Sequence, residues 1–211
     1  MRWKKNSLKN ARLYLILDTE VCDYSRLFEI LKDSLRSGVD IVQLRDKRGS
    51  AKDILQFSLA AAKLINGRIP YVINDRVDLA LISGCAGVHL GQEDIPLRTA
   101  RKILGSRTLI GVSCQNLEQA RKAQSEGADY VGFGSVFKTL TKPQRQPMEL
   151  SLLNKVGSSV KIPVFAIGGI NAQNAKGLRM RGVERIAVCR DICLAKDVSA
   201  AVRDLQGMFK S

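Results

Sequence analysis

Eight short apolar runs recur along the chain of 211 residues, and their spacing constrains its fold more than any other feature. Each run has five or six residues, and the intervals between runs are long enough for a helix. The runs lie at residues 13–18, 41–45, 71–75, 87–91, 109–113, 130–135, 164–169 and 185–189. The sequence therefore predicts strands and helices in regular alternation.

The intervals between the runs carry the pattern of amphipathic helices. They are rich in Ala, Leu, Lys and Glu, and their apolar residues are spaced for one helical face. This pattern predicts helices at residues 25–37, 51–65, 117–126, 172–180 and 199–209. Gly38, Gly127 and Gly182 each stand just before a run, where we expect them to end a helix and turn the chain into the next strand.

This alternation favours one fold class. Strands that are almost continuously apolar belong to a sheet covered on both faces, and strand–helix alternation pairs them in parallel through right-handed crossovers. Eight such repeats predict an α/β fold, a single (β/α)8 TIM barrel with parallel strands. A doubly wound open sheet is the alternative, but its G-x-G-x-x-G fingerprint is not found after the first run.

The length favours one domain. At 23.2 kDa the chain can bury one sizeable core, whereas two separate cores would each be small. We expect a basic N-terminal extension over residues 1–12 and a catalytic barrel over residues 13–211. The extension lacks the apolar core of a secretory signal, and no run reaches the roughly 18 apolar residues of a membrane span. We therefore expect a cytoplasmic protein with no membrane partner.

The chain is strongly basic, with 34 Lys and Arg against 20 Asp and Glu, a formal net charge of +14. A field of this sign attracts anions, either nucleic acid or phosphorylated metabolites. Aromatic residues make up only 5% of the chain, and neither an RNA-recognition motif nor a zinc finger is found. We therefore expect small anionic ligands and no nucleic acid.

Three cations follow the predicted strands. In a (β/α)8 barrel the functional side chains gather at the carboxyl ends of the strands. Arg45 and Lys47 follow the second run and Lys142 follows the sixth, and together they suit a diphosphate. Each cation alone is more simply a solvated surface charge. Their shared location at strand ends favours a binding site.

Two acids stand at or just after run ends: Asp75 is the last residue of the third run, and Asp94 follows the fourth. Neighbouring strands lie about 5 Å apart in a sheet, so one divalent ion could lie between these carboxylates. In a basic site a cation is useful only beside an anionic ligand, and Mg²⁺ is commonly bound by one or two carboxylates plus substrate phosphates. The alternative, equally weighted, is that both residues cap short helices.

Three further features are ambiguous on local evidence. Residues 138–147 are polar and hold two prolines, which indicates a loop and a candidate lid over the site. Gly168 and Gly169 end a buried strand, either as a plain turn or as bare backbone that an anion can approach. His89 is the only histidine, and we assign it a structural role because a lone histidine in a buried strand is usually hydrogen-bonded.

Together these motifs resemble thiamine-phosphate synthase, over residues 13–204. The family consists of (β/α)8 barrels that join 4-amino-5-hydroxymethyl-2-methylpyrimidine diphosphate to a thiazole phosphate, giving thiamine phosphate and pyrophosphate. The resemblance thus implies a Mg²⁺-dependent transferase of alkyl groups acting in thiamine biosynthesis. The matching segments are Gln43-Leu-Arg45-Asp-Lys47, Asn74-Asp75-Arg76, Gly87-Val-His89-Leu-Gly-Gln92-Glu-Asp94, Gly111-Val-Ser113, Gly127-Ala-Asp129-Tyr-Val, Thr139-Leu-Thr141-Lys142 and Ala166-Ile-Gly168-Gly169-Ile.

The resemblance also implies roles for individual residues. Arg45, Ser113 and Lys142 would be catalytic, and Asp75 and Asp94 would hold Mg²⁺. The pyrimidine diphosphate would be bound by Gln43, Leu44, Arg45, Asp46, Lys47, Asn74, Ser113 and Lys142. The thiazole phosphate would be bound by Thr139, Leu140, Thr141, Gly169, Cys189 and Arg190.

One departure and two alternatives accompany this interpretation. The family usually has an apolar residue and a serine at the last strand end, where this chain has Cys189 and Arg190. Arg190 either holds the phosphate by charge or points outward into solvent. The alternatives are a thiazole tautomerase-like relative of the same fold, which would not need the diphosphate and metal residues, and a non-enzymatic basic protein that binds anions. The sequence does not decide between a monomer and a homo-oligomer.

Overall fold

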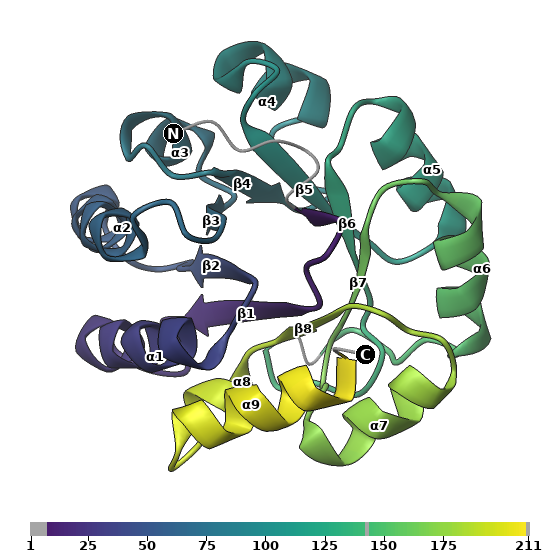
Figure 1. Ribbon diagram of the computed structural model, residues 1–211. Helices are drawn as coiled ribbons and strands as arrows, with labels where there is room; N and C mark the ends of the chain where they lie inside the picture. Colours follow the sequence, from purple (N-terminus) through teal and green to yellow (C-terminus); the bar gives the residue numbers. More distant parts are fainter. Residues whose placement is uncertain (1–7, 142–143, 210–211) are drawn as a thin grey trace.

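The computed structural model describes residues 8–141 and 144–209. Within these residues, eight parallel strands close into a barrel in sequence order, from β1 to β8 (Figure 1). The predicted (β/α)8 barrel is therefore confirmed. The strands are β1 (Leu13–Asp18), β2 (Ile41–Arg45), β3 (Tyr71–Asn74), β4 (Gly87–Leu90), β5 (Leu109–Cys114), β6 (Tyr130–Phe133), β7 (Val164–Ile167) and β8 (Ile186–Val188).

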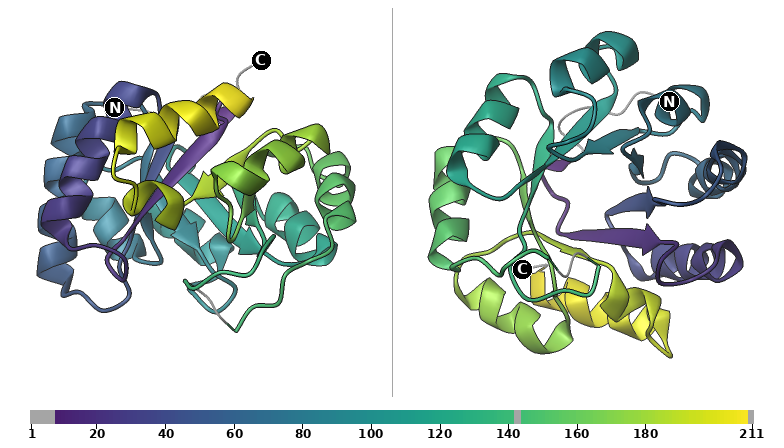
Figure 2. Two further views of the ribbon diagram at one scale, coloured as in Figure 1. Left: turned by 90° about the horizontal axis from the view of Figure 1, so that it is seen from below. Right: turned by 180° about the vertical axis from the view of Figure 1, so that it is seen from behind.

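Helices surround the barrel on the outside in all views (Figure 2). The last helix packs against both α1 and α7, so the ring of helices closes on itself. None of the described helices is long and apolar enough to cross a bilayer. The helices are α1 (Tyr24–Ser37), α2 (Ala51–Ile65), α3 (Val77–Ile82), α4 (Leu97–Leu104), α5 (Leu117–Ser125), α6 (Ser151–Ser159), α7 (Ala172–Met180), α8 (Arg190–Cys193) and α9 (Val198–Phe209).

Backbone conformation explains where two strands end before the predicted position. The third run was predicted through Asp75, but Asp75 has φ 62°, a left-handed conformation that ends β3 at Asn74. The seventh run was predicted through Gly169, but Gly168 has φ 108° and β7 ends at Ile167. Both positions turn the chain out of the barrel, so the residues that follow belong to loops at the carboxyl rim.

The ends of the five predicted helices agree closely with the structure, whereas four further helices lie outside the predicted ranges. Gly38 caps α1 with φ 95°, and Gly127 and Gly182 follow α5 and α7 with φ 94° and 82°. The helices outside the predicted ranges are α3, α4, α6 and α8. α3 and α8 have only six and four residues, and α4 and α6 bury only three and two side chains, so each offers a short apolar pattern.

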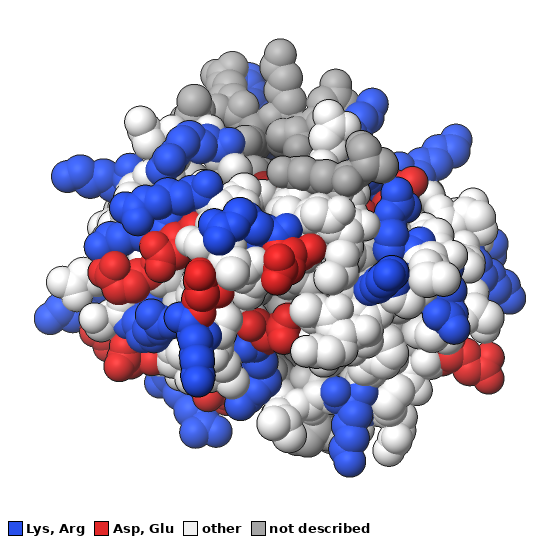
Figure 3. All heavy atoms as spheres, turned by 60° about the horizontal axis from the view of Figure 1, so that its bottom comes forward, with Lys and Arg blue, Asp and Glu red and all other residues white. Residues whose placement is uncertain are grey.

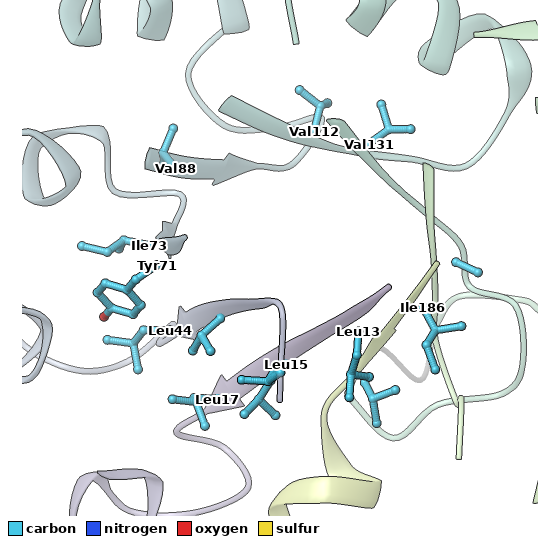
Figure 4. Close-up of a cluster of buried hydrophobic side chains, with 14 of the residues drawn as sticks. Leu13, Leu15, Leu17, Leu44, Tyr71, Ile73, Val88, Val112, Val131 and Ile186 are labelled. Carbon is cyan, nitrogen blue, oxygen red and sulfur yellow. The ribbon is translucent and has the colours of Figure 1, made fainter. Parts of the chain in front are cut away.

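Side chains alternate along each strand between two apolar clusters. The outer cluster lies between strands and helices and includes Leu13, Leu15 and Leu17 of β1, as Figure 4 shows. The inner cluster lies inside the barrel and includes Tyr14 and Ile16 of the same strand. Because of this alternation, every second residue of a strand faces the barrel interior. The same alternation decides which polar residues near the carboxyl ends of the strands point into the barrel.

The described part of the predicted N-terminal extension contributes to the barrel core. Leu8 and Ala11 are buried within the inner cluster, beside Tyr14 and Phe165. Arg12 and Leu13 both donate backbone hydrogen bonds to the carboxylate of Asp40, at 2.8 and 2.9 Å. Residues 8–12 therefore pack as part of the barrel, although the sequence places them in the extension.

Candidate active site

A cavity of about 760 Å³ opens at the carboxyl ends of the strands. All eight strands of the described chain contribute to its wall, as expected for the functional face of such a barrel. These residues are Ile16, Gln43, Asn74, His89, Ser113, Gly132, Ile167 and Ala187. Of the predicted site residues, the wall includes Gln43, Arg45, Asn74, Ser113, Thr139, Leu140, Thr141, Gly169, Cys189 and Arg190.

Arg45 is held by two carboxylates at the edge of this cavity. Its Nη1 lies 3.0 and 2.8 Å from the two carboxylate oxygens of Asp18 and 2.8 Å from Oε2 of Glu20. Asp18 is fully buried and Arg45 is 8% exposed. The Arg45 guanidinium also holds the pKa of Glu20 below its usual value, through a hydrogen bond and its charge. The predicted anion-binding arginine is therefore fixed in place by neighbouring acids.

Lys47, Asp75 and Asp94 form a compact charged group beyond the ends of β2, β3 and β4. The Lys47 ammonium donates to Oδ2 of Asp75, and the carboxyl groups of Asp75 and Asp94 lie within hydrogen-bond reach of each other. Burial, together with the neighbouring Asp94, raises the pKa of Asp75 although Lys47 opposes the rise. Two acids from neighbouring strand ends thus converge, with a cation beside them.

The helix-cap alternative for these two acids is not supported. The residue that precedes α3 is Arg76, and the residue that precedes α4 is Pro96; neither makes a side-chain cap. Asp94 instead accepts a 2.6 Å hydrogen bond from the backbone of Gly91. The described residues hold no group of three or more His, Cys, Asp or Glu side chains arranged for a metal. Further ligands for an ion at this pair would therefore have to come from substrate or water.

Asp46 and Leu44 do not face the large cavity. Asp46 accepts hydrogen bonds from Tyr24 Oη and from the backbone N–H groups of Arg48 and Gly49, so it organises the loop between β2 and α2. Leu44 belongs to the outer cluster, because it alternates with the inward-facing Gln43 and Arg45. The Leu44 side chain therefore faces the helices and not the cavity, and a part for this residue in substrate binding stays a prediction.

The loop after β6 and the turn after β7 are joined by hydrogen bonds. The N–H groups of Val136 and Phe137 donate to the carbonyls of Ile167 and Gly168, both at 2.9 Å. A Cβ at Gly168 would lie 2.2 Å from Ser135 Oγ, and one at Gly169, where φ is 63°, would lie 2.4 Å from a backbone carbonyl. Only glycine fits this close approach. The turn therefore presents bare backbone to the cavity.

The predicted thiazole-phosphate residues meet on one side of the cavity. Thr139, Leu140 and Thr141 face it from the loop after β6, and Cys189 and Arg190 face it from the end of β8. Arg190 is partly buried and, among the described residues, its guanidinium has no acidic partner within ion-pair distance. Of the two readings of Arg190, the geometry favours the one in which it faces the site. Lys142 lies outside the described residues.

Sequence reasoning missed two acids and underestimated one histidine. Asp18 ends β1, so the rule that found Arg45 would have found Asp18 if applied to the first strand. Glu20 follows it in the next loop, and no pattern marks it. His89 Nε2 lies 3.0 Å from Ser113 Oγ in the cavity wall. The histidine is hydrogen-bonded as predicted, but its partner is a predicted substrate-binding residue.

Lys and Arg side chains on the face shown in Figure 3 are spread between acidic and uncharged residues. They do not form a continuous basic stripe on that face, as a track for a nucleic-acid backbone would. The convergence of cations and bare backbone is found at the cavity instead. A barrel of this kind, with a cavity lined by cations and bare backbone at the carboxyl ends of its strands, has the architecture of the class of (β/α)8 enzymes that place their active sites there.

Comparison with known proteins identifies the family within this class. Residues 13–192 match the family described as thiamine monophosphate synthase. The chain is 40% identical to a thiamine-phosphate synthase of Fusobacterium nucleatum, over 96% of this chain and 98% of that protein. It is 38% identical to one of Ruminiclostridium cellulolyticum, over 93% and 94%. The chain therefore belongs to the thiamine monophosphate synthase family.

A solved structure gives the same result. The thiamine phosphate pyrophosphorylase from Pyrococcus furiosus superposes with a TM-score of 0.86 at 35% identity, covering 98% of this chain and 97% of that one. The resemblance inferred from the motifs is thus confirmed, and with it the assignment to a transferase of thiamine biosynthesis that acts on small phosphorylated substrates.

Proposed function

We propose that the chain condenses 4-amino-5-hydroxymethyl-2-methylpyrimidine diphosphate with a thiazole phosphate in a Mg²⁺-dependent reaction that releases pyrophosphate. The observation that carries this proposal is the group formed by Lys47, Asp75 and Asp94 beside the cavity that Arg45 lines. A diphosphate with a divalent cation needs both positive and negative protein groups at one place, and this rim offers both.

Asp75 and Asp94 fit Mg²⁺ by their chemistry. Both are carboxylates, which are the hard oxygen ligands that this ion prefers, and their closeness disfavours two negative charges in the absence of a cation. Bound there, Mg²⁺ would neutralise charge on the diphosphate and on the departing pyrophosphate. Lys47, which contacts Asp75, is placed to exchange that carboxylate for a phosphate oxygen.

The proposed reaction needs no proton transfer. The C–O bond to the diphosphate breaks with its electron pair on pyrophosphate, and the lone pair of the thiazole nitrogen forms the new C–N bond. No proton leaves the nitrogen, so a general base is not required. Arg45 and Lys47 stabilise the departing charge, while Gln43, Asn74 and Ser113 hold the pyrimidine half. Lys142 is assigned to the same task by the family motif alone.

Thr139, Thr141, Gly169 and Arg190 are proposed to hold the thiazole phosphate. Two hydroxyls, one bare backbone segment and one guanidinium suit a phosphate monoester. The positive charge of Arg190 would take the place of the serine that is usual in the family. With arginine in place of serine the ligand would still be a phosphate, but its negative charge would be compensated by a guanidinium in addition to hydrogen bonds.

The direct test is to incubate the protein with both substrates and to measure thiamine phosphate and pyrophosphate. We expect equal amounts of both products with Mg²⁺ and none after chelation of divalent ions. Product formation that is unchanged after chelation would contradict the metal assignment. Conversion of the thiazole phosphate to an isomer without the pyrimidine substrate would instead support the tautomerase-like alternative. A cytoplasmic location stays a prediction.

A further inference from the structure

A continuous chain of hydrogen bonds crosses the barrel interior beneath the cavity. Gln43 Nε2 donates to Tyr14 Oη at 2.6 Å, and Tyr14 Oη lies 3.0 Å from Tyr130 Oη. Tyr130 Oη lies 3.2 Å from His89 Nδ1, and His89 Nε2 lies 3.0 Å from Ser113 Oγ. The two ends of this chain, Gln43 and Ser113, both line the cavity. The two tyrosines between them are not part of its wall.

The surrounding packing fixes the two phenol rings. Tyr14 is 1% exposed and Tyr130 is fully buried. Phe165 meets the Tyr14 ring edge-on at 5.4 Å and the Tyr130 ring at 5.8 Å. A Cβ at Gly111 would lie 2.1 Å from the Tyr130 ring, so the glycine in the neighbouring strand makes the space that this ring occupies.

Gln43, the donor at one end, favours one direction for the bonds along the chain. Because Tyr14 accepts from Gln43, its own hydroxyl hydrogen is available to Tyr130, and the hydrogen of Tyr130 is then available to His89 Nδ1. In this direction His89 would carry its proton on Nε2 and donate it to Ser113 Oγ. Burial raises the pKa of both tyrosines, which keeps both phenols protonated for this purpose.

We propose that Tyr14 and Tyr130 are positioning residues that set the hydrogen-bond polarity of the cavity wall. Through them, the Ser113 hydroxyl is left as a donor toward the ligand, and the Gln43 amide keeps its carbonyl oxygen as an acceptor beside its second N–H. The wall would then select a ligand that presents a hydrogen-bond acceptor to Ser113 and an N–H donor to Gln43. An aminopyrimidine diphosphate has both kinds of group, so this inference also specifies how the proposed substrate is oriented.

The first test reads the tautomer of His89 and needs no substrate. The chain has one histidine, so ¹⁵N-labelled protein gives the imidazole signals of this residue alone. We expect the neutral ring with its proton on Nε2 and Nδ1 as an acceptor. A proton on Nδ1 would reverse the chain and overturn the proposal. In Tyr130→Phe we expect the preference for one tautomer to weaken, because Nδ1 loses its donor.

The second test compares matched removals of a buried phenol hydroxyl. Tyr71 is 2% exposed and makes a 3.0 Å hydrogen bond to Ser58, but it belongs to the outer cluster and does not line the cavity. Tyr130→Phe should lower kcat/KM for the pyrimidine diphosphate by about tenfold, as expected for one oriented hydrogen bond, whereas Tyr71→Phe should change it by less than about twofold. Equal losses in the two variants would show a purely structural role.

A double-mutant cycle identifies the residue through which Tyr130 acts. If its effect passes through His89 to Ser113, Tyr130→Phe should add less than about a twofold loss in a Ser113→Ala background. Tyr14→Phe serves as the second variant. In this variant we expect the KM of the pyrimidine substrate to change more than kcat. Full additivity of Tyr130→Phe and Ser113→Ala would overturn the proposal.

These readouts separate the inference from the proposed function. The histidine tautomer can be measured in a protein that forms no thiamine phosphate, so loss of the proposed function would leave the first test intact. Conversely, if the enzyme is active and the proton lies on His89 Nδ1, the proposed function stands and the role of the tyrosines is contradicted.

Discussion

Arg45 and Asp18 form a buried ion pair at the ends of β2 and β1, with Arg45 Nη1 2.8 Å from Asp18 Oδ2. The two residues are register partners in the barrel, so their side chains emerge side by side on its inner face. Glu20 adds a second carboxylate at 2.8 Å, from a side chain that is 31% exposed. Arg45, which is predicted to bind the diphosphate, is therefore held in one orientation by these two acids.

This arrangement predicts a stability cost for losing Asp18. Removal of one partner from a buried pair leaves the other charge poorly compensated, and Asp18→Ala should lower the free energy of unfolding by about 3 kcal/mol. Urea unfolding checks this value. Glu29→Ala, which removes an exposed pair with Lys32, should cost less than about 1 kcal/mol. Equal costs for the two variants would show that burial of the Arg45 pair has no energetic weight.

The pair of Asp75 and Asp94 predicts a pH-dependent stability. Burial and the nearby Asp94 raise the pKa of Asp75, so the folded protein keeps a proton that the unfolded chain has already lost. Without divalent ions, the melting temperature should therefore fall as pH rises from about 4, the ordinary value for aspartate, through the raised pKa. Asp94→Asn should flatten this dependence. An unchanged pH profile in that variant would contradict the coupling.

The same two residues predict the response to Mg²⁺. Mg²⁺ with inorganic pyrophosphate should raise the melting temperature of the unaltered protein, since a ligand that binds only the folded state stabilises it. Asp94→Asn should abolish most of this increase and reduce Mg²⁺-dependent turnover by about 100-fold or more. Asp78→Asn is the control, because Asp78 pairs with Arg76 on the surface. If Asp94→Asn kept the full rise in melting temperature, this would contradict the proposed metal site.

Gly169 predicts a local effect on thiazole-phosphate binding. Gly169→Ala places a Cβ against a backbone carbonyl at a positive φ, which should cost about 1–3 kcal/mol of stability and raise the KM for the thiazole phosphate. Gly157→Ala is a matched control, because Gly157 lies exposed in α6 with no atom within 4 Å of an added Cβ. It should be neutral or stabilising by up to about 1 kcal/mol.

The position of Arg190 in the cavity wall predicts that its charge contributes to binding of the thiazole phosphate. Arg190→Ser should raise the KM for the thiazole phosphate by about tenfold, the effect of one charge-assisted hydrogen bond, while the KM for the pyrimidine diphosphate changes little. Steady-state kinetics with each substrate varied in turn measure both constants. Arg203→Ser, on the exposed side of α9, controls for the loss of one positive charge. Equal changes in both variants would place Arg190 outside the site.

Much of the fold follows from local pattern, and the exceptions have local causes. The runs at 13–18 and 41–45 match β1 and β2 at both ends, because continuous apolar residues can only be buried on both faces. α6 was not predicted, since it buries only Leu153 and Val156 and contains a glycine and several serines. In such segments the barrel supplies the stability that the helix pattern lacks.

Individual residues of the candidate site could be predicted from their place along a strand. Arg45, Asn74 and Ser113 lie at the carboxyl ends of their strands and face inward by parity, which is a property of the sequence. The partners of these residues were not predictable in the same way. Asp18 and Glu20 meet Arg45 across 25 to 27 residues of chain, and no spacing rule relates them.

The sequence by itself determined the order of strands and helices, the inward parity of each strand and the family. Those properties depend on residues that are near in the chain, through alternation, apolar periodicity and motifs at strand ends. Tertiary structure decided which charges are paired, that Tyr14 and Tyr130 connect Gln43 to Ser113, and that Leu44 faces the helices. The reason is that barrel closure brings together strands distant in sequence, and only this closure sets which side chains share a hydrogen bond.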